Sequence, residues 1–360
     1  MKIMTVLGVR PQFIKAAAVS RAIRNNYSSI IDEVIVHTGQ HFDENMSKVF
    51  FDDLDIPKPK YNLEISGGSH GAMTGRMLEA IEVVALTEKP DYVLVYGDTN
   101  STLAGALAAA KLQIPVLHVE AGLRSFNNRM PEELNRIVTD RISSMLFCPS
   151  EIATKNLINE GIFDGVYISG DVMYDVALYY KERAIRESNI IQSLGIVTGH
   201  YALATCHRAE NTDNSLSLEN ILSALSEISN AIPVVLPLHS RTRGFISKFG
   251  LDYLIKNLIV TDPLPFLDML TLEQSAKVIL TDSGGVQKEA FFYGVPCITM
   301  RNETEWIETV QLGCNSLVGS QAETIIQEFF SHKSFPSTAP NPYGDGHAAS
   351  KILSILVNQT

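Results

Sequence analysis

Short apolar runs alternate with helix-like segments along the whole of this 360-residue chain, and this alternation restricts the fold more than any other feature. Such runs are typical of strands buried on both faces, with crossover helices between them. The expected strands are residues 3–7, 33–37, 92–96, 116–119, 145–148, 201–205, 234–237, 258–261, 278–281 and 297–299. The expected helices include residues 13–24, 72–86, 132–144, 216–229 and 286–293. We predict an α/β fold with parallel sheets that helices cover on both faces.

The alternation pauses between residues 174 and 200, where a helix-like pattern leads into a polar, less regular segment. Domains have about 100–200 residues each, so a chain of this length is expected to form two. We expect two Rossmann-like domains that face a central cleft, with residues 1–172 in the first and residues 173–344 in the second. The C-terminal residues 345–360 contain a helix pattern, which we expect to pack back on the first domain.

The composition excludes several classes of partner. The net charge of −11 argues against non-specific binding to nucleic acid or to an anionic membrane, although a cleft in an acidic protein can still bind a small anion. The first apolar run is too short for a signal peptide and ends at Arg10-Pro11. The alanine-rich stretch 102–119 contains Lys111 and Pro115, so it is no membrane span. We therefore expect a cytoplasmic protein with no membrane partner.

Cofactor motifs are absent from the sequence. The four cysteines form no C-x-x-C pair and none is near a histidine at metal-ligand spacing, which predicts buried thiols and no metal site. The chain has no Walker A loop, no G-x-G-x-x-G fingerprint and no G-x-S-x-G nucleophile motif. We therefore expect no cofactor.

Polar residues follow the expected strands of the first half, and ligands of parallel sheets bind beyond the carboxyl ends of the strands. Arg10 and Lys15 follow the first strand at a helix start, where cations oppose the helix dipole unless an anion is bound. Asp98 follows the third strand, and Asp98 or Asn100 is a candidate N-cap of the next helix. A solvated basic turn and an ordinary capped helix are the alternatives.

Further acidic residues belong to the same half. Glu120 ends the fourth strand, where partial burial favours the protonated form and makes the side chain a candidate general acid or base. Glu132 and Glu133 follow Pro131 at the start of another helix. Their alternative role is that of acids favoured by the helix dipole.

Basic residues follow two strands of the second half. The strand 201–205 leads through Cys206 into His207 and Arg208, and His239 begins a second basic cluster after the strand 234–237. A lone histidine is more often structural than catalytic. A His-Arg pair at the carboxyl end of a strand is more indicative of an anion site.

A glycine pair opens a helix after the strand 278–281. Ser283, Gly284 and Gly285 offer bare backbone N–H groups as a phosphate cradle, with the serine hydroxyl as an additional donor. Glu289, one turn later, is a candidate acceptor for ribose hydroxyls.

Together these segments resemble the non-hydrolysing UDP-N-acetylglucosamine 2-epimerase family. Ten blocks match in order along the chain: GVRPQFIK, HTGQH, YGDTNSTLAG, HVEAGLRS, PEELNR, CHRAEN, PLH, LTDSGGVQKEA, MRNETEW and NPYGDGHAASKI. Each block is common by itself, but ten in register are highly specific. The resemblance implies a GT-B type fold, as in many nucleotide-sugar glycosyltransferases, a UDP-sugar substrate and a homodimer.

The resemblance also implies roles for residues. The catalytic set is Asp98, Glu120, Glu132 and His207. The three carboxylates belong to the first domain, and the histidine, which supports the diphosphate, belongs to the second. The UDP-binding set, with Arg208 added because it adjoins that histidine, is Arg10, Lys15, Arg208, Ser283, Gly284, Gly285, Glu289, Arg301, Thr304 and Glu305. Segments tied to an allosteric UDP-sugar site in bacterial relatives are matched at Gln40, His41 and His239.

The family's reaction inverts C2 of a 2-acetamido sugar without a redox cofactor. A carboxylate removes the C2 proton while UDP leaves C1, and the resulting glycal is reprotonated on the other face before UDP adds back. The carboxylates therefore need different proton affinities, so that one acts as base and another as acid. The resemblance does not assign the two steps among them.

Several positions depart from the family members that act on UDP-N-acetylglucosamine. Trp306-Ile307 stands where they have Arg-Pro, Gln12-Phe13 where they have Glu-Ala, and the loop 125–130 is shorter. These features resemble the subfamily acting on UDP-2,3-diacetamido-2,3-dideoxyglucuronate, and Arg129 is a candidate partner for the added carboxylate.

Other readings of the resemblance stay open. UDP-N-acetylglucosamine and a UDP-linked 6-deoxy 2-acetamido sugar are the alternative substrates. A UDP-sugar glycosyltransferase and a non-catalytic UDP-sugar sensor are the alternative functions. The family implies that the product serves a surface polysaccharide such as O-antigen.

Overall fold

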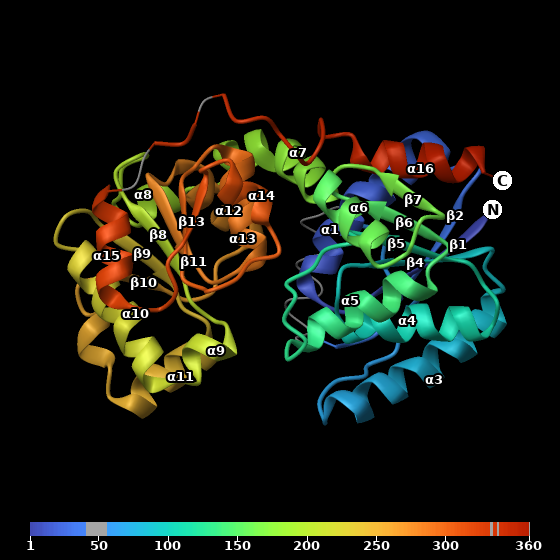
Figure 1. Ribbon diagram of the computed structural model, residues 1–360, viewed down its shortest axis with the longest axis horizontal. Helices are drawn as coiled ribbons and strands as arrows, with labels where there is room; N and C mark the ends of the chain where they lie inside the picture. The colour runs from blue at the N-terminus through green and yellow to red at the C-terminus, as the bar shows by residue number, and fades with distance from the viewer. Residues whose placement is uncertain (41–55, 332–333, 337, 360) are drawn as a thin grey trace. The chain divides into compact units, whose positions relative to one another are not determined.

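The computed structural model describes residues 1–40, 56–331, 334–336 and 338–359, and the chain divides into two compact units. Unit 1 contains Met1–Val176 and the residues from Asn341 onward, and unit 2 is Ala177–Pro340. Each unit is a parallel sheet with helices packed on it, as Figure 1 shows for each unit taken separately. The predicted α/β fold with parallel sheets is confirmed.

The described residues of unit 1 form a seven-stranded sheet in the order β3-β2-β1-β4-β5-β6-β7, with all pairs parallel. The strands are β1 (Lys2–Leu7), β2 (Asp32–His37), β3 (Tyr61–Asn62), β4 (Tyr92–Tyr96), β5 (Val116–Val119), β6 (Met145–Cys148) and β7 (Val166–Ile168). The helices are α1 (Arg10–Ala22), which continues into the π-helical turn η1 (Ile23–Tyr27), α3 (His70–Glu88), α4 (Asn100–Lys111), α5 (Pro131–Ile142), α6 (Glu151–Asn159) and α16 (Ala348–Asn358). Helix α7 (Val172–Glu187) begins in unit 1 and ends in unit 2.

Helix α4 contains most of the alanine-rich stretch. It packs on the sheet and against both α3 and α5, with Ala104 and Ala108 fully buried. A Cβ atom on Gly105 would lie 3.1 Å from Val95 and 3.2 Å from Val6, so the backbone approaches the sheet closely. Small residues are therefore required because the helix lies between other elements. Among the described helices, none has the length and apolarity needed to cross a bilayer.

The described residues of unit 2 form a six-stranded parallel sheet in the order β10-β9-β8-β11-β12-β13. The strands are β8 (Ala202–Thr205), β9 (Val234–Pro237), β10 (Ile259–Thr261), β11 (Val278–Thr281), β12 (Cys297–Thr299) and β13 (Asn315–Leu317). The helical segments are α8 (Ile190–Ser193), α9 (Ala209–Thr212), α10 (Ser215–Ile228), α11 (Ser240–Phe249), η2 (Asp252–Ile255), α12 (Phe266–Ser275), α13 (Gly284–Tyr293), α14 (Ile307–Gln311) and α15 (Ala322–Ser331).

The strands of unit 2 are apolar at consecutive positions because both faces of the sheet are buried. One face packs against α10 and α15 and buries Ala204 and Leu280. The other face packs against α12 and α13 and buries Leu203 and Ile279. The continuous apolar runs seen in the sequence are the signature of this two-sided burial.

The ten predicted strands are present, each within one residue of the expected bounds. The described residues contain three further strands, β3, β7 and β13, which are only two or three residues long and carry no periodic pattern. The predicted N-cap of α4 was wrong. The cap is Thr99, whose side chain accepts from the backbone N–H of Thr102, while the Asp98 side chain is bound elsewhere.

The C-terminal helix α16 belongs to unit 1 and packs against α1. The Asp175 carboxylate, from the first turn of α7, accepts hydrogen bonds from the backbone N–H groups of Ala348 (2.9 Å) and Ala349 (2.8 Å). These donors have no partner within the helix itself, and a carboxylate there also complements the helix dipole. Leu353 and Leu356 are buried on the inner face of α16.

Candidate functional site

Each sheet has one point at which the strand order reverses. In unit 1 it lies between β1 and β4, and in unit 2 between β8 and β11. Loops at such a point diverge from the carboxyl ends of the strands and leave a crevice for a ligand. The candidate residues Asp98, His207 and Ser283 lie in the loops after β4, β8 and β11.

The Asp98 carboxylate is held by an ion pair. Arg136 Nη2 lies 2.6 Å from Asp98 Oδ2, and the Asp98 side chain keeps 30% of its surface exposed. Asn135 Nδ2 donates to the backbone carbonyl of Asp98 at 2.8 Å. The buried Arg136 is itself oriented by Glu133, with 2.7 Å between Nη1 and Oε2. A half-buried carboxylate that an ion pair holds in place is a candidate general base.

Glu120 lies beside Lys15 at the ends of β5 and β1. Lys15 Nζ donates to Glu120 Oε2, and both side chains are largely buried. Glu120 has a φ of 72°, a left-handed conformation that is unfavourable for a non-glycine residue and is frequent at functional sites. Partial burial of Glu120, expected from its place at the end of the strand, is present. The structure adds a cation, which favours the ionised carboxylate.

Glu132 and Glu133 have different environments at the start of α5. Glu132 is half-buried in the first turn. Glu133 is buried and accepts from the backbone N–H groups of Ser125 and Phe126, at 2.8 to 3.1 Å. Glu133 therefore shapes the 125–130 loop, in which Arg129 is exposed to solvent.

The first turn of α1 is fixed by a buried amide. Gln12 Oε1 accepts from the backbone N–H groups of Gly8 (2.8 Å) and Val9 (3.2 Å). Its Nε2 donates to the carbonyl of Tyr96 and to Thr102 Oγ1, both at 2.9 Å. This side chain therefore connects the loops after β1 and β4, and its amide group supplies both the acceptor and the donor that these contacts need.

Arg10 is the first residue of α1 and is partly exposed. Gln40, predicted for an allosteric site, follows β2, and its side chain contacts the start of α4. Its Oε1 accepts from the backbone N–H (3.1 Å) and the hydroxyl (2.7 Å) of Ser101. His41, predicted for the same site, lies outside the described residues.

Asp282 organises the loop that carries His207. The buried Asp282 carboxylate accepts from the backbone N–H groups of His207 and Arg208 and from Asn211 Nδ2, at 3.0 to 3.1 Å. His207 Nδ1 lies 3.5 Å from Asp282 Oδ1. Partial desolvation lowers the pKa of His207, and the Asp282 carboxylate opposes this shift. The loop after β8 is thus held against the end of β11, beside the start of α13.

Helix α13 begins at Gly284, with Ser283 as its N-cap. A Cβ atom on Gly284 would lie 3.4 Å from Trp306 Nε1 and 3.8 Å from Arg208 Nη2, and one on Gly285 would meet its first neighbour, Ser283 Oγ, at 3.9 Å. The first amides of the helix, an indole N–H and a guanidinium therefore lie around one point, with the Glu305 carboxylate also 3.8 Å from the Cβ position of Gly284. This arrangement is suited to binding a phosphate group.

The residues of the MRNETEW block support this helix start. Arg301 is buried, with Nη1 3.2 Å from Glu305 Oε2 and Nε 3.3 Å from Glu210 Oε1. Thr304 Oγ1 donates to Gln287 Oε1 at 2.6 Å. These contacts join the loop after β12 to α9 and α13.

Trp306 forms a cation–π contact beside the cradle. Lys288 Nζ lies 4.0 Å from the centroid of the Trp306 ring, and both residues are buried. A desolvated contact of this kind contributes about 2 kcal/mol. Glu289 follows in the second turn of α13, with Oε2 4.0 Å from a Cβ atom on Gly285.

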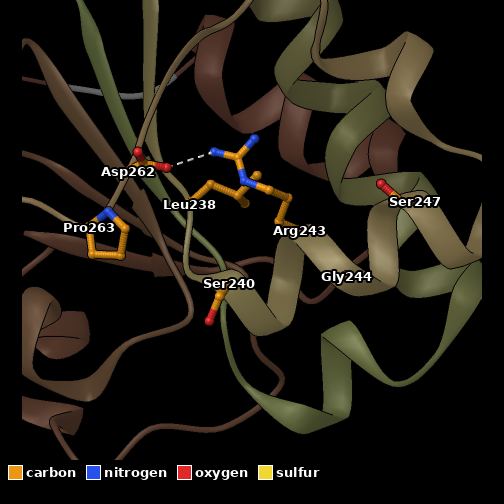
Figure 2. A pocket seen from close by; sticks show the side chains of 7 residues that line it. All are labelled: Leu238, Ser240, Arg243, Gly244, Ser247, Asp262 and Pro263. Atoms are coloured by element: carbon orange, nitrogen blue, oxygen red, sulfur yellow. Dashed lines mark hydrogen bonds and ion pairs between the residues drawn. The ribbon is translucent and has the colours of Figure 1, made fainter. Parts of the chain in front are cut away.

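A separate pocket of about 390 Å³ opens at the carboxyl ends of β9 and β10 (Figure 2). Its lining residues are Leu238, Ser240, Arg243, Gly244, Ser247, Asp262 and Pro263. Arg243 Nη2 lies 3.2 Å from Asp262 Oδ1 across it. His239 caps the adjacent helix α11 through Nδ1, which accepts from the backbone N–H of Arg241 at 3.3 Å. The pocket is distinct from the cluster around Gly284.

Comparison with known proteins decides the family. The family model described as UDP-N-acetylglucosamine 2-epimerase matches residues 23–357. The chain belongs to the UDP-N-acetylglucosamine 2-epimerase family. It is accordingly an isomerase of the UDP-sugar 2-epimerase type.

Three relatives of this epimerase illustrate the likeness. The UDP-2,3-diacetamido-2,3-dideoxy-D-glucuronate 2-epimerase of Pseudomonas aeruginosa is 53% identical, over 99% of both chains. A UDP-N-acetylglucosamine 2-epimerase homolog of Methanococcus maripaludis is 52% identical, over 99% of this chain and 100% of its own. The crystal structure of the Methanocaldococcus jannaschii UDP-GlcNAc 2-epimerase in complex with UDP-GlcNAc and UDP superposes with a TM-score of 0.92 at 44% identity, over 99% of this chain and 100% of that one.

In the epimerase, several of the predicted residues lie together in each unit. Unit 1 brings Lys15, Asp98 and Glu120 together around the loops after β1, β4 and β5. Unit 2 gathers Arg208, Gly284 and Glu305 at the start of α13. In the described part of the chain, no group of three or more His, Cys, Asp or Glu side chains is arranged to hold a metal ion.

Sequence reasoning missed two residues of the epimerase clusters. Arg136 pairs with Asp98, and Asp282 holds the His207 loop. Both lie inside the matching blocks PEELNR and LTDSGGVQKEA. Each is a charged residue at an otherwise apolar position of a helix or strand end, and this feature could have indicated a buried ion pair.

Proposed function

We propose that this epimerase inverts C2 of UDP-2,3-diacetamido-2,3-dideoxy-glucuronate and yields the manno-configured epimer. The substrate assignment rests on the 53% identity, over 99% of both chains, to the UDP-2,3-diacetamido-2,3-dideoxy-D-glucuronate 2-epimerase of Pseudomonas aeruginosa. The indole of Trp306 beside the phosphate cradle and the short 125–130 loop agree with that assignment.

The residues of unit 2 are assigned to UDP. The first amides of α13, the Arg208 guanidinium and His207 offer donors to a diphosphate, and Glu289 offers an acceptor to ribose hydroxyls. Arg301, Thr304 and Glu305 support this group from the neighbouring loop. The same donors stabilise the charge that develops on the diphosphate when it leaves C1.

The carboxylates of unit 1 are assigned to proton transfer. Asp98 and Glu120 are each held by an ion pair with a cation, and we assign the removal of the C2 proton to one of these two carboxylates. As the C2–H bond breaks, its electron pair forms the C1–C2 double bond and the C1–O bond to UDP breaks. A protonated carboxyl group on the opposite face then delivers a proton to C2, and the UDP oxygen adds back to C1. Glu132 belongs to this set, and Arg10 and Lys15 are assigned to the UDP-sugar.

UDP-N-acetylglucosamine is the second candidate substrate. The relative from Methanococcus maripaludis, at 52% identity, is named a UDP-N-acetylglucosamine 2-epimerase homolog, and the Methanocaldococcus jannaschii structure contains UDP-GlcNAc. The two sugars differ by a carboxylate at C6 and an acetamido group at C3. Arg129, exposed in the 125–130 loop, is the residue that we assign to the carboxylate.

Proton NMR in deuterated water distinguishes the two substrates. The enzyme is incubated with each UDP-sugar in a separate tube, and the C2 signal is followed. We expect deuterium at C2 and a manno product with the uronate. Turnover of UDP-N-acetylglucosamine alone would contradict the substrate assignment, and sugar transfer to an acceptor without exchange at C2 would indicate a glycosyltransferase.

Arg129→Ala tests the carboxylate contact. We expect KM for the uronate to rise about tenfold, which corresponds to the loss of one charge-assisted contact of about 1.4 kcal/mol. The turnover of UDP-N-acetylglucosamine, if any is measured, should not change. An equal effect on both sugars would remove Arg129 from the sugar site.

We also propose a cytoplasmic homodimer whose product serves a surface polysaccharide such as O-antigen. The proposal rests on the family and on the substrate class, because nucleotide sugars are the building blocks of polysaccharides. Light scattering after gel filtration tests the dimer, with an expected mass of twice the 39.6 kDa chain. A mass of one chain at micromolar concentration would contradict it.

A further inference from the structure

An ionic cluster with a buried centre lies behind the loop that carries Asp98, and its outer member Glu160 keeps 34% of its side-chain surface exposed. His118 on β5 contacts Asp140 on α5, with 2.7 Å between Nδ1 and Oδ1. Arg124 Nη1 lies 2.8 Å from Asp140 Oδ2, and its Nε lies 2.7 Å from Glu160 Oε1. The His118 and Asp140 side chains have no exposed surface, so these two residues do not contact a substrate directly.

The hydrogen bonds determine the protonation of His118. Its Nε2 lies 2.8 Å from the backbone carbonyl oxygen of Gly97, and a carbonyl only accepts, so Nε2 carries a proton. Asp140 Oδ2 accepts from the backbone N–H of Gly122 (3.1 Å) and from Arg124, as an ionised carboxylate does. The Arg124 guanidinium at Oδ2 favours the ionised carboxylate, whose Oδ1 has no proton to donate, and on that basis we assign the second proton to Nδ1.

The charges of the cluster are balanced in this state. Two cations, His118 and Arg124, face two anions, Asp140 and Glu160. Burial by itself raises the pKa of Asp140, but the neighbouring His118 and Arg124 lower it overall. A buried charge is tolerated only when it is paired and hydrogen-bonded, and each member of this cluster meets that condition.

The imidazole fixes the peptide that precedes Asp98. Gly97 has a left-handed φ of 63°, and its carbonyl is bound by His118. The next carbonyl, that of Asp98, is bound by Asn135, and the Asp98 side chain is bound by Arg136. Of these three restraints, the one from His118 controls the orientation of the Gly97–Asp98 peptide. A rotation of this peptide would turn the Asp98 carboxylate away from its present direction.

We propose that His118 is a doubly protonated positioning residue, whose Nε2–H fixes the Gly97 carbonyl and thereby directs the Asp98 carboxylate at the reacting carbon. The proposal rests on the proposed role of Asp98 in proton transfer. The two ring protons of His118 have different roles. The Nδ1 proton belongs to the buried charge balance, and the Nε2 proton acts on the loop of the acid–base residue.

Two substitutions separate these tasks. In His118→Gln the amide nitrogen reaches the position of Nε2 and keeps the bond to Gly97. In His118→Asn the amide nitrogen lies near the position of Nδ1 and keeps the bond to Asp140. We expect His118→Gln to retain kcat within about tenfold and His118→Asn to lose about 10²-fold, since a displacement of about 1 Å costs that much. The Kd for UDP should be unchanged in both variants.

The outcomes that overturn the proposal are specific. If His118→Asn keeps kcat and His118→Gln loses it, the role of the ring is only structural through Asp140. If both variants keep kcat within twofold, His118 does not position Asp98. Thermal unfolding accompanies both measurements, because a loss of kcat that follows the loss of folded protein in both variants also contradicts positioning.

A measurement on the unmodified protein makes the result independent of variant folding. We expect ¹⁵N-histidine NMR at pH 7.5 to show both ring N–H groups of one buried histidine among the nine of the chain. A single N–H at His118 would overturn the proposal. Asp98→Asn provides the distinction from the proposed function. Full activity of that variant would refute the role of Asp98 and leave the protonation of His118 standing.

Discussion

Lys15 and Glu120 form an ion pair although 105 positions separate them in the chain. The pair joins α1 to the end of β5 and lies against Gly97, whose Cβ position is 3.0 Å from Lys15 Nζ and 3.1 Å from Glu120 Oε2. A left-handed glycine with no side chain is therefore required where the proposed base, its cation and the Asp98 loop meet.

We expect Glu120→Gln and Lys15→Met each to lower kcat by about 10²-fold. Because each residue stabilises the charge of the other, their effects on the free energy of unfolding should be coupled by about 2 kcal/mol in a double-mutant cycle. Urea unfolding of the four proteins measures this. Glu151→Gln, at an exposed first-turn position of α6, is the matched control and should leave both quantities unchanged. Additive single effects would mean that the pair is not an energetic unit.

Gly285→Ala should fold normally and bind UDP at least tenfold more weakly. The added methyl group meets only Ser283 Oγ at 3.9 Å and Glu289 Oε2 at 4.0 Å, so the fold has room for it, but it occupies the approach to the first amides of α13. Isothermal titration with UDP measures the change. Gly75→Ala in α3 is the control, because a Cβ atom there has no neighbour within 4 Å among the described residues. Unchanged UDP affinity in Gly285→Ala would move the phosphate away from this helix start.

Trp306→Arg introduces the residue that the UDP-N-acetylglucosamine enzymes have, but we expect it to destabilise this protein by about 2–4 kcal/mol. The guanidinium would lie next to the buried Lys288, whose ammonium now contacts the indole ring at 4.0 Å. Trp306→Phe keeps an aromatic face and should cost less than half as much. Chemical unfolding compares the three proteins. Equal stability of the arginine variant would show that Lys288 does not depend on the ring.

Asp140 gives stability a defined pH dependence. Its folded-state pKa is lower than the ordinary value, so its contribution is complete above about pH 4 and is lost as the pH falls through the lower folded-state value. We expect Asp140→Asn to be about 3 kcal/mol less stable at pH 6. The difference from the unmodified protein should shrink at pH 3.5. Asp262→Asn, on a side chain that is 90% exposed, should show no difference at either pH.

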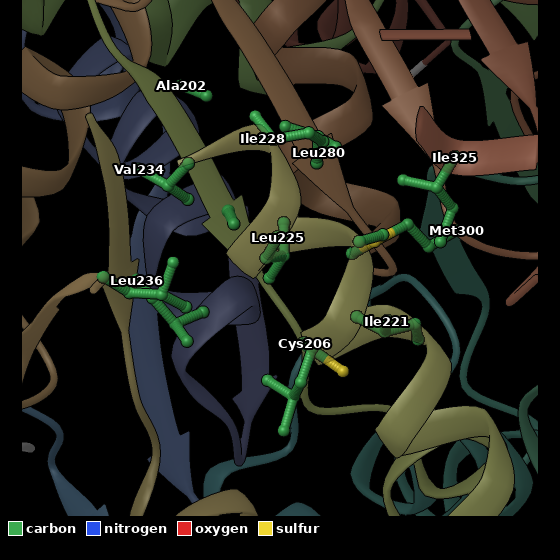
Figure 3. Packing of buried hydrophobic residues seen from close by; sticks show 14 of the residues in the cluster. Ala202, Cys206, Ile221, Leu225, Ile228, Val234, Leu236, Leu280, Met300 and Ile325 are labelled. Carbon is green, nitrogen blue, oxygen red and sulfur yellow. The ribbon is translucent and has the colours of Figure 1, made fainter. Parts of the chain in front are cut away.

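The four thiols should react only after unfolding. Burial raises the pKa of Cys148 and Cys297 to about 12 and that of Cys314 to about 11, and Cys206 is raised as well. Figure 3 shows Cys206 among the packed side chains of the unit 2 core. At pH 8 a disulfide reagent should label the folded protein slowly and all four thiols in guanidinium chloride. Rapid labelling of the native protein would indicate an opening of one core.

The strands of the central sheets were predictable because doubly buried strands leave continuous apolar runs, as at β8 and β11. The short edge strand β3 (Tyr61–Asn62) was not, since two residues carry no pattern. The sequence also predicted which polar and charged residues follow the strands, and the ten family blocks occur in the same order along the chain. The partners of those side chains were not. The Arg136–Asp98 and Lys15–Glu120 pairs join segments that only the folded sheet brings together. The N-cap of α4 was expected at Asp98 or Asn100, and Thr99 takes that position.

The ribosome delivers unit 1 in two portions. Residues up to Val176 emerge first, but α16, which packs against α1 and is capped by Asp175, emerges only after all of unit 2 has been translated. Unit 2 is continuous in sequence and can complete its own core during synthesis, when domains fold as units. The nascent unit 1 must therefore keep the surface that α16 covers exposed throughout that interval. Unit 1 therefore begins to fold before unit 2 but completes its structure only after unit 2 has been synthesised.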